Sequence, residues 1–267
     1  MRLSHLISPV LIAFTFTFLA SAAPDQGYSK VKPDRAAVIE KLEAGTVKGK
    51  VDLPWRLFVP KEASKDKPLP LVVFFHGAGR RGTDNVGPME LAWNFITPEA
   101  QAKNPCFVLA PQMNKAWVDH PFSKGSYSAD KVKISDEMQE TLDLVEKLIK
   151  ERPIDPKRIY AVGQSMGGFG TWDAMIRKPD LWTAGAPICG GGDPTKAESI
   201  KNIAIWAWHG ENDNTVPVSG SREMIDALKK VGANPKYSEI PKGGHGVWEK
   251  AFSDPKFFEW LFAQKKP

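Results

Sequence analysis

The chain is poor in the residues that build metal sites and disulfides. Its 267 residues include two cysteines, Cys106 and Cys189, and five histidines, none with the spacing of a metal motif such as H-E-x-x-H. We therefore expect no metal and no other cofactor. Cys106 begins one apolar run and Cys189 ends another, so the two would lie at opposite edges of a parallel sheet. We expect two buried, unpaired thiols.

A strong charge asymmetry is also missing. Lysines and arginines number 36 against 31 acids, a net charge of +5, but they alternate with acids, as in residues 61–67. Because no basic stripe with interleaved aromatic residues occurs, the sequence gives little support to a nucleic-acid partner. With 42% apolar and 25% charged residues, the chain is typical of one globular domain with a large core.

The longest apolar run, residues 6–20, lies near the N-terminus. Arg2 precedes it and the small residues 20–23 follow it, which is the pattern of a secretory signal peptide and its cleavage site. The run is too short and too weakly flanked to favour a transmembrane helix. We expect residues 1–22 to be a signal peptide, the protein to be secreted or periplasmic, and no stable membrane insertion after cleavage.

Shorter apolar runs recur along the rest of the chain and indicate the fold. Residues 71–75 are continuously apolar, which indicates burial on both faces of a parallel sheet. Further strands are predicted near 106–110, 158–162, 183–188, 203–208 and 236–240, with edge strands near 45–50 and 55–59 separated by Pro54. Helices are predicted near 36–43, 88–102, 135–150, 166–177, 220–230 and 247–263. This alternation predicts an α/β fold, with a mostly parallel central sheet of about eight strands and helices on both faces.

Residues 163–167 read Gly-Gln-Ser-Met-Gly and directly follow the apolar run 159–162. The pattern predicts a strand that turns sharply into a helix and lifts the hydroxyl of Ser165 above the sheet edge. Glycines are needed at 163 and 167, because a side chain there would collide with the neighbouring strand and helix. Ser165 is therefore the predicted nucleophile.

A serine nucleophile needs a base to take its proton and a carboxylate to orient that base. After such a serine, the acid and then the histidine follow in the chain. His245, flanked by glycines, is the last histidine of the sequence and the predicted base. The acid should follow the strand 203–208; Asp213 is the first choice and Glu211 the alternative. His209 is expected to help shape this turn.

Acyl transfer also needs N–H donors for the oxyanion of the tetrahedral intermediate. One should be the backbone N–H of Met166, directly after the nucleophile. The other should come from the glycine-rich loop 76–82, which follows the strand 71–75; Ala78 is the first choice and Gly79 the alternative.

Aromatic residues of the insert 112–132 are candidates for substrate contact. Trp117, Phe122 and Tyr127 follow the carboxyl end of a predicted strand, where such folds bind ligands. Together with Gln164, which precedes the nucleophile, they form the predicted substrate-binding set.

At these motifs the chain resembles the α/β-hydrolase superfamily, and within it the secreted single-domain esterases of the polyhydroxybutyrate-depolymerase-like, feruloyl-esterase-like and prolyl-oligopeptidase-like group. The resemblance spans about residues 45–263 and rests on His76 through Asn85, Ala110-Pro111-Gln112 with Trp117, Gly163 through Gly168, His209 through Pro217, and Gly244-His245. It implies a triad of Ser165, Asp213 and His245, with the backbone amides of Ala78 and Met166 as the oxyanion hole. The pattern of the group often carries an acid where Arg80 stands.

The resemblance implies a secreted serine carboxylic-ester hydrolase that acts through an acyl-enzyme on carbohydrate-linked, feruloyl-type or polyester substrates. The expected organisation is a signal peptide over residues 1–22, an N-terminal arm over 23–44 and a single catalytic domain over 45–267. One alternative is a serine peptidase of prolyl-oligopeptidase-like type, although such peptidases usually carry a large additional domain. Another is a non-catalytic binding protein on a hydrolase scaffold, which would gain nothing from keeping all three triad residues.

Overall fold

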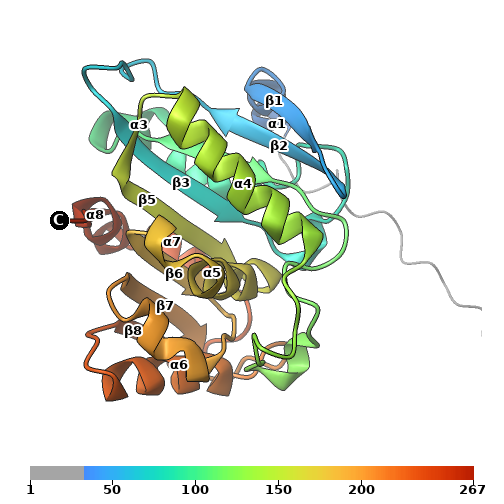
Figure 1. The fold of residues 1–267 in the computed structure, drawn as a ribbon, viewed down its shortest axis with the longest axis vertical. Coiled ribbons are helices and arrows are strands. Elements are labelled where there is room, and N and C mark those ends of the chain that lie inside the picture. Colours follow the sequence, from blue (N-terminus) through green and yellow to red (C-terminus); the bar gives the residue numbers. More distant parts are fainter. Residues whose placement is uncertain (1–32) are drawn as a thin grey trace, which may run out of the picture.

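The computed structural model describes residues 33–267, so the expected signal peptide and the start of the arm lie outside the described residues. Residues 33–267 contain one eight-stranded sheet in the order β1-β2-β4-β3-β5-β6-β7-β8 (Figure 1). The strands are β1 (Glu43–Lys48), β2 (Asp52–Phe58), β3 (Leu69–Phe75), β4 (Phe107–Pro111), β5 (Ile154–Gln164), β6 (Ala184–Ile188), β7 (Ala204–Gly210) and β8 (Lys236–Ile240). The β1–β2 and β2–β4 pairs are antiparallel and the remaining pairs are parallel, so the predicted sheet is confirmed.

The first two strands differ from the sequence-based prediction of two edge strands separated by Pro54. Pro54 lies inside β2, opposite Thr46 of β1, and β2 is an inner strand between β1 and β4. The proline is tolerated because the β2–β4 ladder begins only at Trp55. Its carbonyl still accepts the N–H of Gln112 at 2.7 Å.

Helices cover both faces of the sheet, as predicted. The face toward the viewer in Figure 1 carries α4 (Asp136–Glu151), α5 (Met166–Arg177) and α6 (Ser219–Lys230). The opposite face carries α1 (Pro33–Ile39), α2 (Met89–Ala92), α3 (Pro98–Lys103), α7 (Trp248–Ser253) and α8 (Pro255–Ala263). Ser135 caps α4, because its hydroxyl accepts the N–H of Met138 at 3.1 Å.

Burial on both faces explains the continuous apolar runs. Every residue of β3 is buried. Leu71, Val73 and Phe75 contact the core beneath α4, α5 and α6, whereas Val72 and Phe74 contact the core beneath α7 and α8. A strand with a core on each side cannot alternate between apolar and polar residues.

Proline interrupts two of the predicted helices. The predicted helix 88–102 is divided into α2, the 3₁₀ helix η2 (Trp93–Phe95) and α3, and the predicted helix 247–263 into α7 and α8. The side chains of Thr97 and Asp254 cap the helices that begin at the following proline, accepting N–H bonds of 3.1 and 2.9 Å. The residue before a proline disfavours the helical conformation, so a new helix begins at each proline.

The described part of the N-terminal arm packs on the sheet. The helix predicted at 36–43 lies earlier, at Pro33–Ile39, and the side chain of Ile39 is fully buried beside the residues of β3 that face α7 and α8. Because β1 begins at Glu43, the expected boundary at residue 45 falls inside a strand. Among residues 33–267, the helices are all too short or too polar to cross a bilayer.

Both cysteines lie in the core, without a bond between them. Cys106 directly precedes β4 and Cys189 directly follows β6, so they lie at opposite ends of parallel strands. Burial raises the pKa of the Cys106 thiol to about 12 and also raises the pKa of Cys189.

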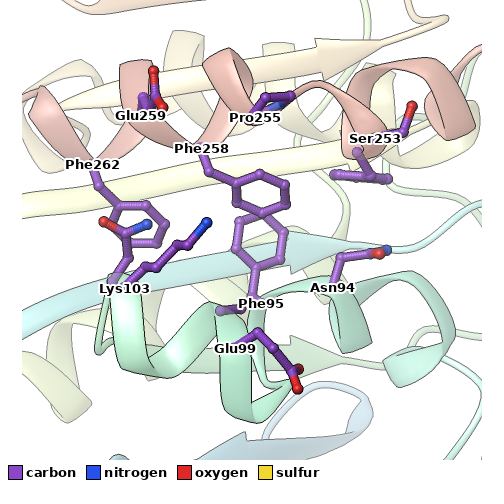
Figure 2. A pocket seen from close by; sticks show the side chains of 12 residues that line it. Asn94, Phe95, Glu99, Lys103, Ser253, Pro255, Phe258, Glu259 and Phe262 are labelled. Atoms are coloured by element: carbon purple, nitrogen blue, oxygen red, sulfur yellow. The ribbon is translucent and has the colours of Figure 1, made fainter.

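An aromatic cavity of about 230 Å³ lies between α3 and the two C-terminal helices (Figure 2). Phe95 and Phe258 point toward each other across it, with ring centroids 5.3 Å apart, and Lys103 extends over it from α3. Ser165 and His245 do not line this cavity. It is therefore separate from the candidate site described next.

Candidate active site

Ser165 lies in a sharp turn between β5 and α5. Its backbone has φ 57° and ψ −122°, which is unusual for a residue other than glycine. A Cβ on Gly163 or Gly167 would collide with the carbonyl oxygen of Phe75, and one on Gly163 also with that of Gly167. The predicted need for glycine at both positions is therefore borne out by the packing. The turn leaves the Ser165 side chain partly exposed, where a ligand can reach it.

A continuous chain of hydrogen bonds leads from Ser165 into the protein. The Oγ of Ser165 is 2.8 Å from Nε2 of His245, and Nδ1 of His245 is 2.7 Å from Oδ2 of Asp213. The three side chains come from the ends of β5 and β7 and from the loop after β8, at the carboxyl edge of the sheet. A hydroxyl bonded to an imidazole that a carboxylate orients is the arrangement that activates a serine nucleophile.

The carboxylate of Asp213 is buried and held on both oxygens. Oδ1 accepts the backbone N–H groups of Thr215 and Val216, at 2.8 and 2.9 Å. Burial alone would raise the pKa of Asp213, but hydrogen bonds from His209, His245 and those two N–H groups hold it well below its ordinary value. Asp213 therefore stays ionised wherever the protein is folded near neutral pH.

The alternative acid, Glu211, lies elsewhere. Its Oε2 accepts the backbone N–H of Lys242 at 2.8 Å, and its side chain is exposed. The structure brings Asp213, and not Glu211, to His245.

The loop after β3 lies beside the Ser165 turn, because Phe75 at the end of β3 pairs with Gly163 of β5. The backbone N–H groups of Ala78, Gly79 and Met166 have no hydrogen-bond partner among residues 33–267. Unpaired N–H groups next to a nucleophile are the donors that an oxyanion hole requires. The N–H groups of both predicted donors, and that of the alternative Gly79, are thus available to donate to a ligand.

His76 fixes the start of this loop as a neutral imidazole. Its Nδ1 lies 2.8 Å from the carbonyl of Gly77, to which it donates, and its Nε2 accepts the N–H of Met113 at 3.1 Å. Full burial lowers the pKa of His76 to about 4. A neutral ring satisfies both partners, whereas a protonated ring would lose one.

Gln112 and an ion pair hold the rest of the loop. The side chain of Gln112 accepts the N–H of Asn85 at 2.5 Å and donates to the carbonyl of Arg80 at 3.1 Å. Arg80 is almost fully buried and forms a salt bridge with Glu90. The resembled group often carries an acid at this position. This chain carries the buried Arg80 there, and its acidic partner, Glu90, lies in the following segment.

The structure places two of the predicted substrate-binding residues in the core instead. Trp117 is fully buried, and its Nε1–H donates to the carbonyl of His76 at 3.0 Å. The hydroxyl of Tyr127 donates to Oδ1 of the buried Asp173 at 2.6 Å. Both rings anchor the insert to the domain, so their burial gives no support to the predicted place in an acyl or sugar pocket. Their apolar contacts are internal because the insert folds back onto α5.

Of the other two predicted contacts, Phe122 is partly exposed and Gln164 is buried next to the serine turn. Phe122, in the 3₁₀ helix η3 (Phe122–Lys124), is partly exposed and packs on Phe169 of α5 with ring centroids 5.3 Å apart. The amide of Gln164 lies beside Gly77, and its Oε1 is buried without a hydrogen-bond partner among residues 33–267. Their contact with substrate stays a prediction.

Sequence reasoning missed Trp248. Its partly exposed indole stands perpendicular to the His245 imidazole, with ring centroids 5.3 Å apart. Its spacing of three residues after His245 could have indicated a place beside the site. Trp248 shields one edge of the imidazole.

A thiol, an imidazole and a carboxylate also meet beneath the site. The ligand atoms of Cys189, His209 and Asp213 lie within 4.8 Å of one another. However, these atoms are already bound within the protein: Sγ of Cys189 lies 3.4 Å from the carbonyl of His245, and His209 and Asp213 are hydrogen-bonded as described. The cluster is therefore packed as a hydrogen-bond network.

Residues 60–258 match the family model described as phospholipase/carboxylesterase. The chain belongs to this family. The mostly parallel eight-stranded sheet of residues 33–267 is the α/β-hydrolase fold. In this phospholipase/carboxylesterase family member, the serine turn, the histidine loop and the acid loop all lie within the matched residues.

Solved structures and curated proteins that are similar to this chain also include esterases. The crystal structure of a thermostable esterase is 38% identical, with a TM-score of 0.78, over 86% of this chain and 64% of that one. Feruloyl esterase B of Piromyces equi is 29% identical over 119 residues, which are 40% of this chain and 22% of that protein. Poly(3-hydroxyalkanoate) depolymerase C of Paucimonas lemoignei is 25% identical over 148 residues, 42% of this chain and 35% of that protein. The chain thus spans about a third or less of these two curated relatives.

Proposed function

We propose that this member of the phospholipase/carboxylesterase family is a serine carboxylic-ester hydrolase that works through an acyl-enzyme. The observation that carries the proposal is the hydrogen-bond chain from the accessible Ser165 through His245 to the buried, ionised Asp213. The unpaired N–H groups of Ala78 and Met166 supply the second requirement, donors for a developing oxyanion.

The reaction proceeds in two halves. Ser165 Oγ attacks the ester carbonyl carbon while His245 Nε2 takes its proton, and Asp213 stabilises the resulting imidazolium. The oxyanion accepts hydrogen bonds from Ala78 and Met166 N–H. His245 then gives the proton to the departing alcohol, which leaves an acyl group on Ser165. Water, deprotonated by His245, attacks the acyl carbon; the bond to Ser165 Oγ then breaks, His245 returns the proton to that oxygen, and the acid is released.

The substrate class we propose is an extracellular ester: carbohydrate-linked, feruloyl-type or polyester. Support comes from the names of relatives, which include a feruloyl esterase, a poly(3-hydroxyalkanoate) depolymerase and an acetylxylan esterase/xylanase. The signal-peptide pattern of residues 1–22 supports export to where such polymers occur. The proposed aromatic contacts are Phe122, which is partly exposed and packs on Phe169 of α5, and Trp248, which is partly exposed beside His245.

The test is a panel of substrates with one variant as control. Hydrolysis of p-nitrophenyl acetate, p-nitrophenyl butyrate, methyl ferulate and a peptide amide is measured for the natural chain and for Ser165→Ala. We expect turnover of the esters, and a loss of about 10⁴-fold or more in Ser165→Ala. Turnover that survives this substitution would sink the mechanism.

The same panel separates the alternatives. A preference for the peptide amide over all esters would indicate a serine peptidase. Absence of turnover on every ester, in a folded protein, would favour a binding protein on a hydrolase scaffold. The complete hydrogen-bond chain argues against a binding protein, which would not need it. The strained backbone of Ser165 argues in the same direction, because strain lowers stability and has no use in a binding protein.

A further inference from the structure

A second histidine contacts the acid of the proposed site. His209, at the end of β7, is fully buried. Its Nδ1 is 2.7 Å from Oγ of Ser221 on α6, and its Nε2 is 3.1 Å from the carbonyl of Val216 and 3.3 Å from Oδ2 of Asp213. The reaction described above does not use this residue.

The partners of His209 fix the position of its proton. The carbonyl of Val216 and the ionised carboxylate of Asp213 are both acceptors, so Nε2 must carry a hydrogen. The hydroxyl of Ser221 can donate or accept, and it also lies 3.1 Å from the carbonyl of Gly190. His209 therefore donates Nε2–H to the carbonyl of Val216, with Oδ2 of Asp213 3.3 Å from the same nitrogen as a second acceptor, and Ser221 of α6 holds the ring from behind.

Two imidazoles thus lie against the same carboxylate oxygen. Oδ2 of Asp213 accepts Nδ1–H of His245 at 2.7 Å from one side, and on the other side it is 3.3 Å from Nε2 of His209, whose one hydrogen is shared with the carbonyl of Val216. A carboxylate that can rotate about its bond to Cβ would present Oδ2 to His245 in only some orientations. The backbone N–H groups on Oδ1 limit this rotation, and the fixed Nε2–H of His209 limits it further from the side of Oδ2.

We propose that His209 is a positioning residue: its Nε2–H holds the Asp213 carboxylate in the orientation in which Oδ2 accepts Nδ1–H of His245. This inference rests on the proposed function, because positioning matters only if His245 is the base. The alternative is a purely structural role, in which His209 only holds the turn at Val216 against β7. The two differ in whether the loss of Nε2–H changes the rate of the chemical step or only the stability.

The test compares four variants. His209→Phe keeps the ring volume without a donor, and His209→Gln places an amide N–H near the position of Nε2. Ser221→Ala removes the anchor behind the imidazole. Ser238→Ala is the control, because it removes another hydrogen bond between neighbouring elements, a partly buried one from Nε1 of Trp206 at 3.0 Å.

We expect His209→Phe to lower kcat for a p-nitrophenyl ester about 10- to 100-fold with KM unchanged, because the reacting groups are misaligned while substrate binding is not. His209→Gln should recover part of the loss, Ser221→Ala should lose less than His209→Phe, and Ser238→Ala should keep kcat. In proton NMR, the downfield resonance of the hydrogen between His245 and Asp213 should move in His209→Phe and stay in Ser238→Ala.

Each outcome of these measurements supports or overturns the positioning role. If folded His209→Phe has the same kcat as the natural chain and its resonance does not move, the positioning role is overturned, even if the variant is less stable. If His209→Phe does not fold, Ser221→Ala decides: an unchanged kcat and resonance overturn the proposal, and a lowered kcat at constant KM supports it. If Ser165→Ala remains active, the proposed function fails, and the NMR resonance alone still tests whether His209 holds Asp213.

Discussion

Asp213 and Glu211 lie two residues apart, yet burial and hydrogen bonding give them different roles. Asp213 accepts two backbone N–H groups and the imidazole of His245, with that of His209 3.3 Å away, whereas Glu211 accepts the N–H of Lys242 at the surface. From sequence alone both carboxylates satisfied the order of serine, acid and histidine. The turn geometry that separates them depends on backbone contacts, which no residue pattern encodes.

We expect Asp213→Asn to lower kcat by about 10³- to 10⁴-fold, because an amide in place of the carboxylate no longer orients and stabilises the protonated His245. Glu211→Gln is the matched control and should leave kcat within about twofold. Steady-state kinetics on p-nitrophenyl butyrate measure both. Equal losses in the two variants would contradict the assignment of the acid.

His76 should make the folded state sensitive to acid. Its pKa is about 4 in the folded protein against 6.5 when exposed, so the unfolded chain binds more protons between these values. Its stabilising contribution is therefore full above pH 6.5 and is lost as the pH falls to 4, by about 3 kcal/mol.

The measurement is the free energy of unfolding by urea at several pH values for the natural chain and for His76→Asn, which keeps a donor toward Gly77. We expect the variant to be less stable at pH 7 but to lose less stability between pH 6.5 and 4. The same pH slope in both proteins would show that His76 does not carry this sensitivity.

Contacts between elements set the shape of the Ser165 turn. Gly167, in the first turn of α5, lies against the carbonyl oxygens of Phe75 and His76 at the end of β3. Glycine lets helix and strand approach this closely, and the G-x-S-x-G pattern predicted it. The breaks in the helices at Pro98 and Pro255 could also have been read from the prolines, whereas the fold-back of the insert 112–132 depends on buried pairs that are far apart in sequence.

Gly167→Ala should destabilise the protein by about 3 kcal/mol, because a methyl group there cannot fit beside the β3 carbonyls. Gly79→Ala is the control, because a Cβ at Gly79 meets no atom within 4 Å. Thermal or urea unfolding of both variants measures the difference. A Gly167→Ala variant as stable as Gly79→Ala would mean that α5 and β3 do not approach as closely as described.

Tyr127 joins the insert to α5 through Asp173, whose pKa is raised by burial. Tyr127→Phe should cost about 1–3 kcal/mol, because it leaves a buried carboxylate with one donor fewer, and KM should not change. Tyr160→Phe, which loses a bond of 2.8 Å to the neutral carbonyl of Gln264, should cost less. A raised KM in Tyr127→Phe with normal stability would return Tyr127 to the substrate-binding set.

At the scale of the whole molecule, the order of strands and helices and the placement of Ser165, Asp213 and His245 at one sheet edge could be predicted from the sequence. Apolar runs mark the buried strands, and parallel strands bring their carboxyl ends together. The place of Trp117 in the core could not be predicted, because an aromatic residue after a strand end is equally suited to packing and to ligand contact. The second histidine at Asp213 required the three-dimensional contacts of β7 with α6.

The most direct test of the central claim is the mass of the intact protein, taken shortly after mixing with a slowly hydrolysed p-nitrophenyl ester. We expect the mass to increase by that of one acyl group, located by peptide mapping to Ser165 and missing in Ser165→Ala. Ester turnover by the natural chain with the acyl group on another residue, or undiminished turnover in Ser165→Ala, would contradict it.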